Sequence, residues 1–131
     1  MSVLHEFLYC STLAADQPIG VIPHILGAAR IRNAKQGVTG VLVFDGQHFC
    51  QHFEGPRATV IKLMEIIARD TRHTQVEVLH QAPLAKRRYR HFSMGYSASE
   101  EAEEIPAIAR LDGGLAVARF LELLPRFDVA R

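Results

Sequence analysis

One stretch in the middle of the chain, residues 38–56, constrains the fold more than any other. It reads VTGVLVFDGQHFCQHFEGP, with two runs of β-branched and aromatic residues on either side of Asp45-Gly46. Because glycine tolerates a positive φ, this dipeptide favours a tight turn between antiparallel strands. The stretch therefore predicts a β-hairpin.

Helical periodicity flanks this hairpin on both sides. We expect a first helix that ends at Asn33 and Gly37, although Gly20 and Pro23 leave its start uncertain. We expect a second helix from Pro56 to Asp70. Apolar residues at helical spacing give each helix one buried face: Ile22, Ile25, Leu26 and Ala29 in the first, and Val60, Leu63, Met64 and Ile67 in the second.

Three further segments read as strands. They are residues 4–10 (LHEFLYC), residues 74–83, with alternation at Val76 and Val78, and residues 91–98 (HFSMGYSA). The element order is then β-α-β-β-α-β-β. Each helix has a single apolar stripe to bury, so both must cover the same face of the sheet. This predicts an α+β, ferredoxin-like sandwich with two helices on one face of a five-stranded mixed sheet.

The composition changes after the last predicted strand. We expect residues 1–97 to form one domain and residues 98–131 a C-terminal helical extension. An acidic segment starts a helix there, Gly113-Gly114 is expected to break it, and a last helix follows. Its apolar stripe either packs on the second face of the sheet or contacts a partner: Val117, Phe120, Leu121 and Leu124.

Length and charge exclude several classes of protein. The 131 residues suit one domain, and a net charge of +1 argues against a nucleic-acid partner. No apolar run is long enough to cross a bilayer, and the N-terminal MSVLHEFLYC lacks the features of a signal peptide. We therefore expect a cytoplasmic protein without membrane contact.

Strand parity brings a few polar side chains together. Phe49, Gln51 and Phe53 share one face of their strand. If the first and third strands are neighbours, Tyr9 stands beside Gln51, and Asn33 can aim its amide into the same space. An unpaired buried polar group costs roughly 1–3 kcal/mol, so these groups either satisfy one another or bind a polar heterocycle.

The cysteines, histidines and a basic loop leave alternatives open. His48, Cys50 and His52 share a strand face that could hold a metal, but we favour an ordinary solvated or helix-covered edge and predict no metal. Cys10 and Cys50 are expected to face each other as reduced thiols, with a redox bridge as the alternative. The loop cations bind phosphates or an acidic partner, or else form a solvated tip: Lys86, Arg87, Arg88 and Arg90.

Several motifs resemble one known family. An N-x-x-x-G-I/V-T-G segment at residues 33–40, an F-x-Q-x-x-E-G segment at residues 49–55 and an R-D-x-R-H segment at residues 69–73 occur in this order. With LYCS near the N-terminus, they resemble the BLUF domain, a sensor of blue light that uses FAD. The resemblance covers roughly residues 3–97 and implies a bound flavin between the two helices.

The resemblance also implies roles for individual residues. Tyr9 matches the tyrosine that gives an electron and a proton to the excited flavin, and Gln51 matches the glutamine that bridges this phenol to the flavin. Asn33, with Arg30 nearby, and the pair Arg72 and His73 match positions beside the flavin ring. The residues expected to relay the signal on the last strand are Met94 and Phe92.

Two positions depart from the family pattern. Phe92 stands where many members have tryptophan, and the chain has no tryptophan at all. This removes an alternative electron donor, so recovery in the dark and signal relay are expected to differ. Ala29 stands before Arg30 where relatives often have serine, which removes one hydrogen bond near the flavin.

The function implied is that of a blue-light photoreceptor with no enzymatic activity. The expected cofactor is FAD, with FMN or riboflavin tolerated. Residues 98–131 are too few for a cyclase or a phosphodiesterase, so we expect output through an unidentified partner protein and a homodimer. The alternatives are a flavin-free ferredoxin-like regulatory domain and an acylphosphatase-like enzyme, which would need an arginine-bearing phosphate loop after the first strand.

Overall fold

A computed structural model of the chain describes residues 3–89, 94–98 and 103–124. Its elements follow the predicted order, with two helices after the last strand. They are β1 (Leu4–Leu13), α1 (Val21–Gln36), β2 (Thr39–Phe44), β3 (His48–Pro56), α2 (Arg57–Arg69), β4 (His73–Leu84), β5 (Gly95–Ala98), α3 (Glu104–Ala109) and α4 (Gly113–Leu123).

The five strands form one sheet in the order β4-β1-β3-β2-β5. All pairings are antiparallel except β2 with β5, which are parallel, so the sheet is mixed as expected. The hairpin turn falls at Asp45–Gln47, where Gly46 adopts a φ of 99° and the Asp45 carboxylate accepts the backbone N–H of Gln47 and His48. The turn needs glycine at this position because few other residues adopt such a φ.

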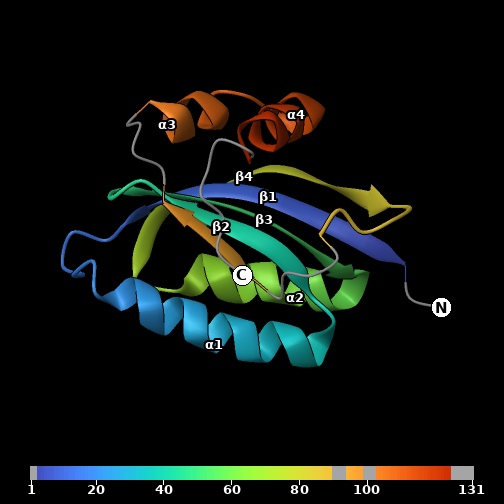
Figure 1. Cartoon of the computed structure of the whole chain (residues 1–131), viewed down its shortest axis with the longest axis horizontal. Coiled ribbons are helices and arrows are strands. Elements are labelled where there is room, and N and C mark those ends of the chain that lie inside the picture. Colours follow the sequence, from blue (N-terminus) through green and yellow to red (C-terminus); the bar gives the residue numbers. More distant parts are fainter. Residues whose placement is uncertain (1–2, 90–93, 99–102, 125–131) are drawn as a thin grey trace.

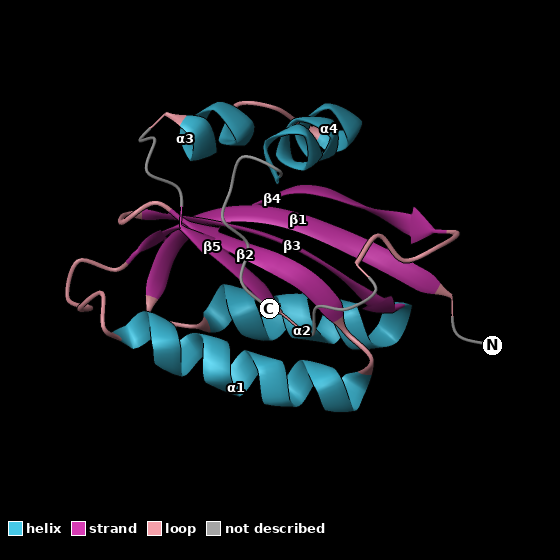
Figure 2. Cartoon of the chain, in the orientation of Figure 1, coloured by secondary structure: helices cyan, strands magenta, loops and turns pink. Residues whose placement is uncertain are grey.

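Helices cover both faces of the sheet (Figure 1). α1 and α2 lie side by side on one face, and α3 and α4 lie on the other (Figure 2). Each interface has its own apolar core: Phe7, Leu42, Phe53 and Leu63 belong to the first, and Leu8, Val43, Ile108 and Phe120 belong to the second. The predicted two-layer sandwich is therefore confirmed, and the C-terminal helices add a third layer by packing on the sheet.

Four details differ from the sequence prediction. α1 continues to Gln36, so Asn33 lies inside it rather than at its end, and Gly37 caps it with a φ of 71°. Gly113 begins α4 instead of breaking a helix. Val78 is 42% exposed, because β4 is an edge strand with a bulge at Leu79, the residue that is buried instead. Met94 precedes β5 (Gly95–Ala98) instead of belonging to it, and residues 90–93, with Phe92 and Arg90, lie outside the described parts of the chain.

Candidate functional site

Tyr9 and Gln51 form the centre of the site. They are direct partners in the pairing of β1 with β3, and the Tyr9 hydroxyl donates a hydrogen bond of 2.5 Å to Gln51 Oε1. Both side chains are about 5% exposed or less. Burial raises the pKa of the Tyr9 phenol well above its ordinary value, so Tyr9 keeps its proton at neutral pH. The predicted contact between phenol and carboxamide is present.

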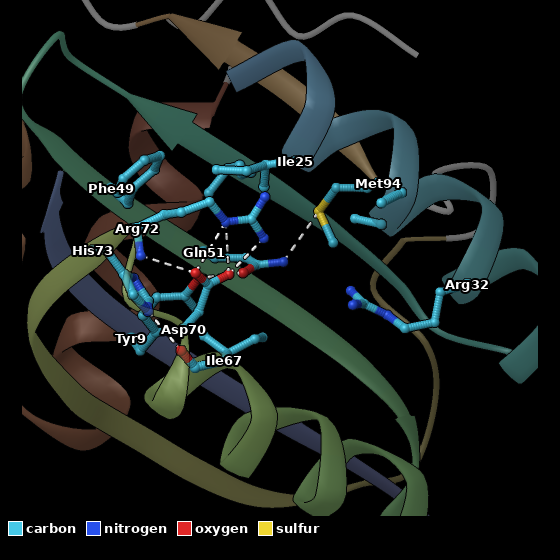
Figure 3. A pocket seen from close by; sticks show the side chains of 13 residues that line it. Tyr9, Ile25, Arg32, Phe49, Gln51, Ile67, Asp70, Arg72, His73 and Met94 are labelled. Atoms are coloured by element: carbon cyan, nitrogen blue, oxygen red, sulfur yellow. Dashed lines mark hydrogen bonds and ion pairs between the residues drawn. The ribbon is translucent and has the colours of Figure 1, made fainter. Parts of the chain in front are cut away.

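Gln51 also connects this pair to the segment before β5. Its Nε2 donates to the Met94 sulfur at 3.4 Å. A thioether is a weak acceptor, so this buried amide can form a stronger bond to an oxygen or nitrogen placed in the pocket. Figure 3 shows Gln51 in the middle of the site, with Met94 on one side and the group around Asp70 on the other.

A pocket opens over this pair between α1 and the end of α2. Its empty volume is about 640 Å³, open solvent at its mouth included. α1 contributes Ile25, Ala28, Ala29 and Arg32, and β2 and β3 contribute Leu42, Phe49 and Gln51. The rest of the lining is Tyr9, Ile67, Asp70, Arg72, His73 and Met94.

Arg72 and His73 each have a partner that fixes their position at the pocket. Arg72 forms a two-pronged ion pair with Asp70, with Nη2–Oδ2 at 2.6 Å and Nε–Oδ1 at 3.0 Å. This hydrogen-bonded guanidinium lowers the pKa of Asp70. His73 Nε2 lies 2.6 Å from the Ile67 carbonyl, to which it must donate, and its Nδ1 lies 2.8 Å from Ser11 Oγ.

Arg30 and Asn33 lie next to residues of the pocket lining. Neither lines the pocket. Arg30 Nε donates to the Met94 carbonyl at 2.9 Å, so it holds the chain at the start of β5. Asn33 is fully buried in α1, and its Oδ1 accepts a hydrogen bond of 3.3 Å from Arg32 Nε. Each residue therefore contacts one that lines the pocket, Met94 and Arg32 respectively.

Arg32 is the pocket cation that the sequence analysis missed. Burial lowers the pKa of its guanidinium, and Figure 3 shows it directed towards the open part of the pocket. The signal was present in the sequence, because Ile25, Ala28 and Ala29 precede it by seven, four and three residues, which places all four on one helix face. Asp70 was also missed, since its role depends on the fold around Arg72.

The residues proposed as an alternative metal site have other partners. His52 lies between Glu6 Oε1 and the Tyr89 hydroxyl, each at 2.7 Å, and His48 contacts Asp45 at 3.0 Å. Within the described residues, no group of three or more histidines, cysteines or carboxylates has the geometry to hold a metal ion. Nor is any helix in these parts long and apolar enough to span a membrane.

The pocket brings a buried phenol, a buried carboxamide and two arginines together. The chain matches the family "Sensors of blue-light using FAD" over residues 4–95. It belongs to this family, the BLUF domains, and its fold is that of a blue-light photoreceptor.

Individual relatives agree with this assignment. The chain is 36% identical over 74 residues to the blue light- and temperature-regulated antirepressor BluF of Escherichia coli, and 42% identical over 77 residues to the photoactivated adenylate cyclase subunit beta of Euglena gracilis. These matches cover 56% and 59% of this chain but only 18% and 9% of the two relatives. The dark-state structure of the BLUF protein BlrB superposes with a TM-score of 0.79 at 33% identity, covering 93% of this chain and 95% of BlrB.

Proposed function

We propose that the chain detects blue light through the Tyr9–Gln51 pair. The observation that carries this proposal is the buried hydrogen bond from the Tyr9 hydroxyl to Gln51 Oε1 at the floor of the pocket. A bound flavin excited by blue light supplies an oxidant able to take an electron from a phenol. Tyr9 holds its proton in the dark and has a proton acceptor in direct contact, so loss of an electron is coupled to transfer of the Oη proton to Gln51 Oε1.

The residues around the pocket fit a flavin ring. Gln51 Nε2 is a buried donor with a weak sulfur acceptor, which a ring carbonyl or ring nitrogen would replace with a stronger one. Arg32 and Arg72 offer donors at the mouth, and the apolar side chains of Ile25, Phe49 and Ile67 suit the faces of an aromatic ring. We propose that Arg30 and Asn33 position these groups, through Met94 and Arg32 respectively.

A second groove next to the pocket indicates which flavin the chain prefers. It lies between α1 and α2, is lined by Arg32, Gln36, Thr59, Lys62, Leu63 and Ile66, and shares Arg32 with the pocket. Two cations and two polar side chains in one groove suit phosphate groups. We therefore propose FAD as the preferred cofactor over riboflavin, with its phosphates near Lys62.

We propose that the signal leaves the site through β3, β5 and the C-terminal region, residues 98–131. Rotation or tautomerisation of the Gln51 amide after the proton transfer changes the group that it presents to Met94, which directly precedes β5. On the other face of the sheet, the neighbouring residue His52 packs edge-on against Phe120 of α4, with ring centroids 5.7 Å apart. These contacts make α4 a suitable element to transmit the change at Gln51 to a partner protein.

The domain itself senses light, and we propose that it has no catalytic activity. Antirepressor and cyclase activities belong to the much longer relatives of which it matches a small part. We also propose that the protein works in the cytoplasm, where the free thiols of Cys10 and Cys50 would be kept reduced.

The test is the visible absorption spectrum of the purified protein before and after blue light. The expected result is a yellow protein whose flavin bands shift reversibly to longer wavelength, because a changed Gln51 amide bonds more strongly to the ring. A colourless protein that also fails to take up added FAD would contradict the proposal and favour a flavin-free regulatory domain on the same fold.

A further inference from the structure

Two cysteines lie directly behind the Tyr9–Gln51 pair. Cys10 and Cys50 are partners in the antiparallel pairing of β1 with β3, one position along from Tyr9 and Gln51. Successive side chains of a strand point to opposite faces, so the thiols lie towards α3 and α4 while the phenol and amide lie towards α1 and α2. The two sulfur atoms are 3.3 Å apart, and both cysteines are free.

The position of these cysteines suits a disulfide bond. Directly opposed residues of antiparallel strands have Cα atoms about 4.5–5.5 Å apart. This range falls inside the separation of about 4.4–6.8 Å that a disulfide spans. The sulfur atoms, now 3.3 Å apart, need to approach by only roughly 1 Å to reach the S–S bond length of about 2.05 Å. A small adjustment of side-chain angles or strand spacing is therefore sufficient.

Cys10 is the more accessible of the two cysteines. A groove beside α3 reaches Cys10, with His48, Glu77 and Arg110 also in its lining. Cys10 is 6% exposed, whereas Cys50 is fully buried and does not line the groove. Burial, together with the neighbouring Cys10 thiol, raises the pKa of the Cys50 thiol, so Cys50 stays protonated at neutral pH. The two thiols are therefore suited to different steps of a disulfide-forming reaction.

We propose that Cys10 and Cys50 form a reversible disulfide and that its redox state tunes the light response of the site. With hydrogen peroxide as the oxidant, the Cys10 sulfur takes one peroxide oxygen, the O–O bond breaks and water leaves, which gives a sulfenic acid. The Cys50 sulfur then displaces the hydroxyl group, which leaves with the Cys50 proton as a second water. The thiols lose two electrons and two hydrogens in total, and a dithiol reductant returns them.

The coupling to light rests on the function proposed above. Drawing the two sulfurs together acts on the strand pair at the position next to Tyr9 and Gln51. The hydrogen bond between these two residues depends on the same strand spacing. The oxidised protein therefore returns to its dark state at a different rate from the reduced protein.

The first experiment tests the disulfide alone. The full chain is treated with hydrogen peroxide in the dark, denatured, and analysed by thiol titration and peptide mass mapping. We expect both thiols to be lost together, with the mass of the linked peptides lower by two hydrogens, and dithiothreitol to restore them. Two persistent free thiols, or a Cys10 that oxidises further without a bridge, would overturn the proposal.

The matched controls are Cys10→Ala and Cys50→Ala, each of which keeps one thiol and cannot form the bridge. They also report peroxide damage elsewhere, such as oxidation of Met94 beside Gln51. In the flavin-loaded wild type, we expect the dark recovery rate to differ about twofold or more between the oxidised and reduced forms, which needs only a small change in barrier. Neither alanine variant should show this difference.

Equal recovery rates in a protein with a mapped disulfide would overturn the coupling and leave the redox site in place. The thiol measurement does not need flavin. A chain that binds no flavin would therefore refute the proposed photoreceptor function without affecting the test of the disulfide, so the two failures are distinguishable.

Discussion

Neighbouring side chains bind the Tyr9 hydroxyl proton and fix the orientation of the Tyr9 ring. The hydroxyl is bonded to Gln51 Oε1, while the ring makes edge contacts with Phe53 and His73 at centroid distances of 6.4 and 6.2 Å. His73 is itself held by Ser11 and the Ile67 carbonyl. The phenol is therefore fixed in the orientation in which loss of its proton to Gln51 needs no side-chain rearrangement.

Lys62 offers a test of the preference for FAD. In Lys62→Gln, we expect the affinity for FAD to fall about two- to fivefold, because an exposed ion pair with phosphate contributes up to about 1 kcal/mol. Riboflavin lacks phosphate, so its affinity should not change. Fluorescence titration with both ligands measures this, and Lys35→Gln is the control, since Lys35 is exposed on α1 and lines neither the pocket nor the groove. An equal loss for both flavins would contradict the phosphate site.

At this scale the sequence predicts contacts between strands better than contacts made by long side chains. Strand parity was enough to bring Tyr9 beside Gln51, because each strand allows only two directions. Arg30 and Arg32 are two residues apart on one helix, and their long side chains take different partners, the Met94 carbonyl and the pocket. Which arginine reaches the pocket depends on the position of β5, and this is not visible in a local pattern.

At the scale of the elements, β3 connects the two faces of the sheet. Gln51 faces the pocket, while the adjacent His52 is buried among Glu6, Tyr89 and Phe120 on the other side. Glu6 of β1 also binds Arg88 and His80, so this cluster joins β1, β3, β4 and the segment after β4. Two cations of the basic loop are thus used within the fold: Arg88 at Glu6, and Arg87 at Thr39 and the Gly37 carbonyl.

This buried cluster predicts a pH dependence of stability. Bonds from His52 and Arg88 outweigh the effect of burial and lower the pKa of Glu6 from 4.5 to about 2. A carboxyl with a depressed folded-state pKa stabilises fully above its unfolded pKa and loses this effect as the pH falls through its folded pKa. We therefore expect Glu6 to contribute about 3 kcal/mol that disappears between pH 4.5 and about 2.

Urea unfolding of the wild type and Glu6→Gln across this pH range measures the contribution of Glu6. The variant should be less stable near neutral pH and should approach the wild type at the acid end. Glu77→Gln is the matched control. Glu77 is an exposed carboxylate on the edge strand β4, and it lies on the same face of the sheet as Glu6. Parallel pH curves for the wild type and Glu6→Gln would contradict the assignment.

The elements that the sequence predicted well are those with strong local signals. The hairpin depends on Gly46 and on two β-rich runs, and α2 depends on an apolar stripe of which Val60, Leu63 and Met64 are buried. The bulge of β4 at Leu79 and the start of α4 at Gly113 depend on packing against other elements. Neither packing effect leaves a local signature in the sequence.

At the scale of the whole molecule, one sheet separates the side with the pocket from the side covered by the C-terminal helices. α1 and α2 enclose the pocket on one face, and α3 and α4 cover the other (Figure 1). Neighbouring residues of β1 and β3 supply both sides, with Tyr9 and Gln51 on the first and Cys10, Cys50 and His52 on the second. A movement of these strands is therefore shared by the pocket and the C-terminal helices.

Two buried tyrosines on opposite faces allow a matched test of the central claim. Tyr9 donates to Gln51 beside the pocket, whereas the hydroxyl of Tyr89 lies 2.7 Å from His52 on the side covered by α3 and α4. Both tyrosines are 5% exposed or less, so replacement by phenylalanine removes a comparable buried hydroxyl from each. The two variants differ mainly in the side of the sheet that they alter.

The most direct measurement is the light-minus-dark absorption spectrum of flavin-loaded wild type, Tyr9→Phe and Tyr89→Phe. The Tyr9–Gln51 account predicts that Tyr9→Phe still binds flavin but shows no reversible shift to longer wavelength, while Tyr89→Phe keeps the shift. A full, reversible shift in Tyr9→Phe would contradict the claim that this tyrosine starts the light response.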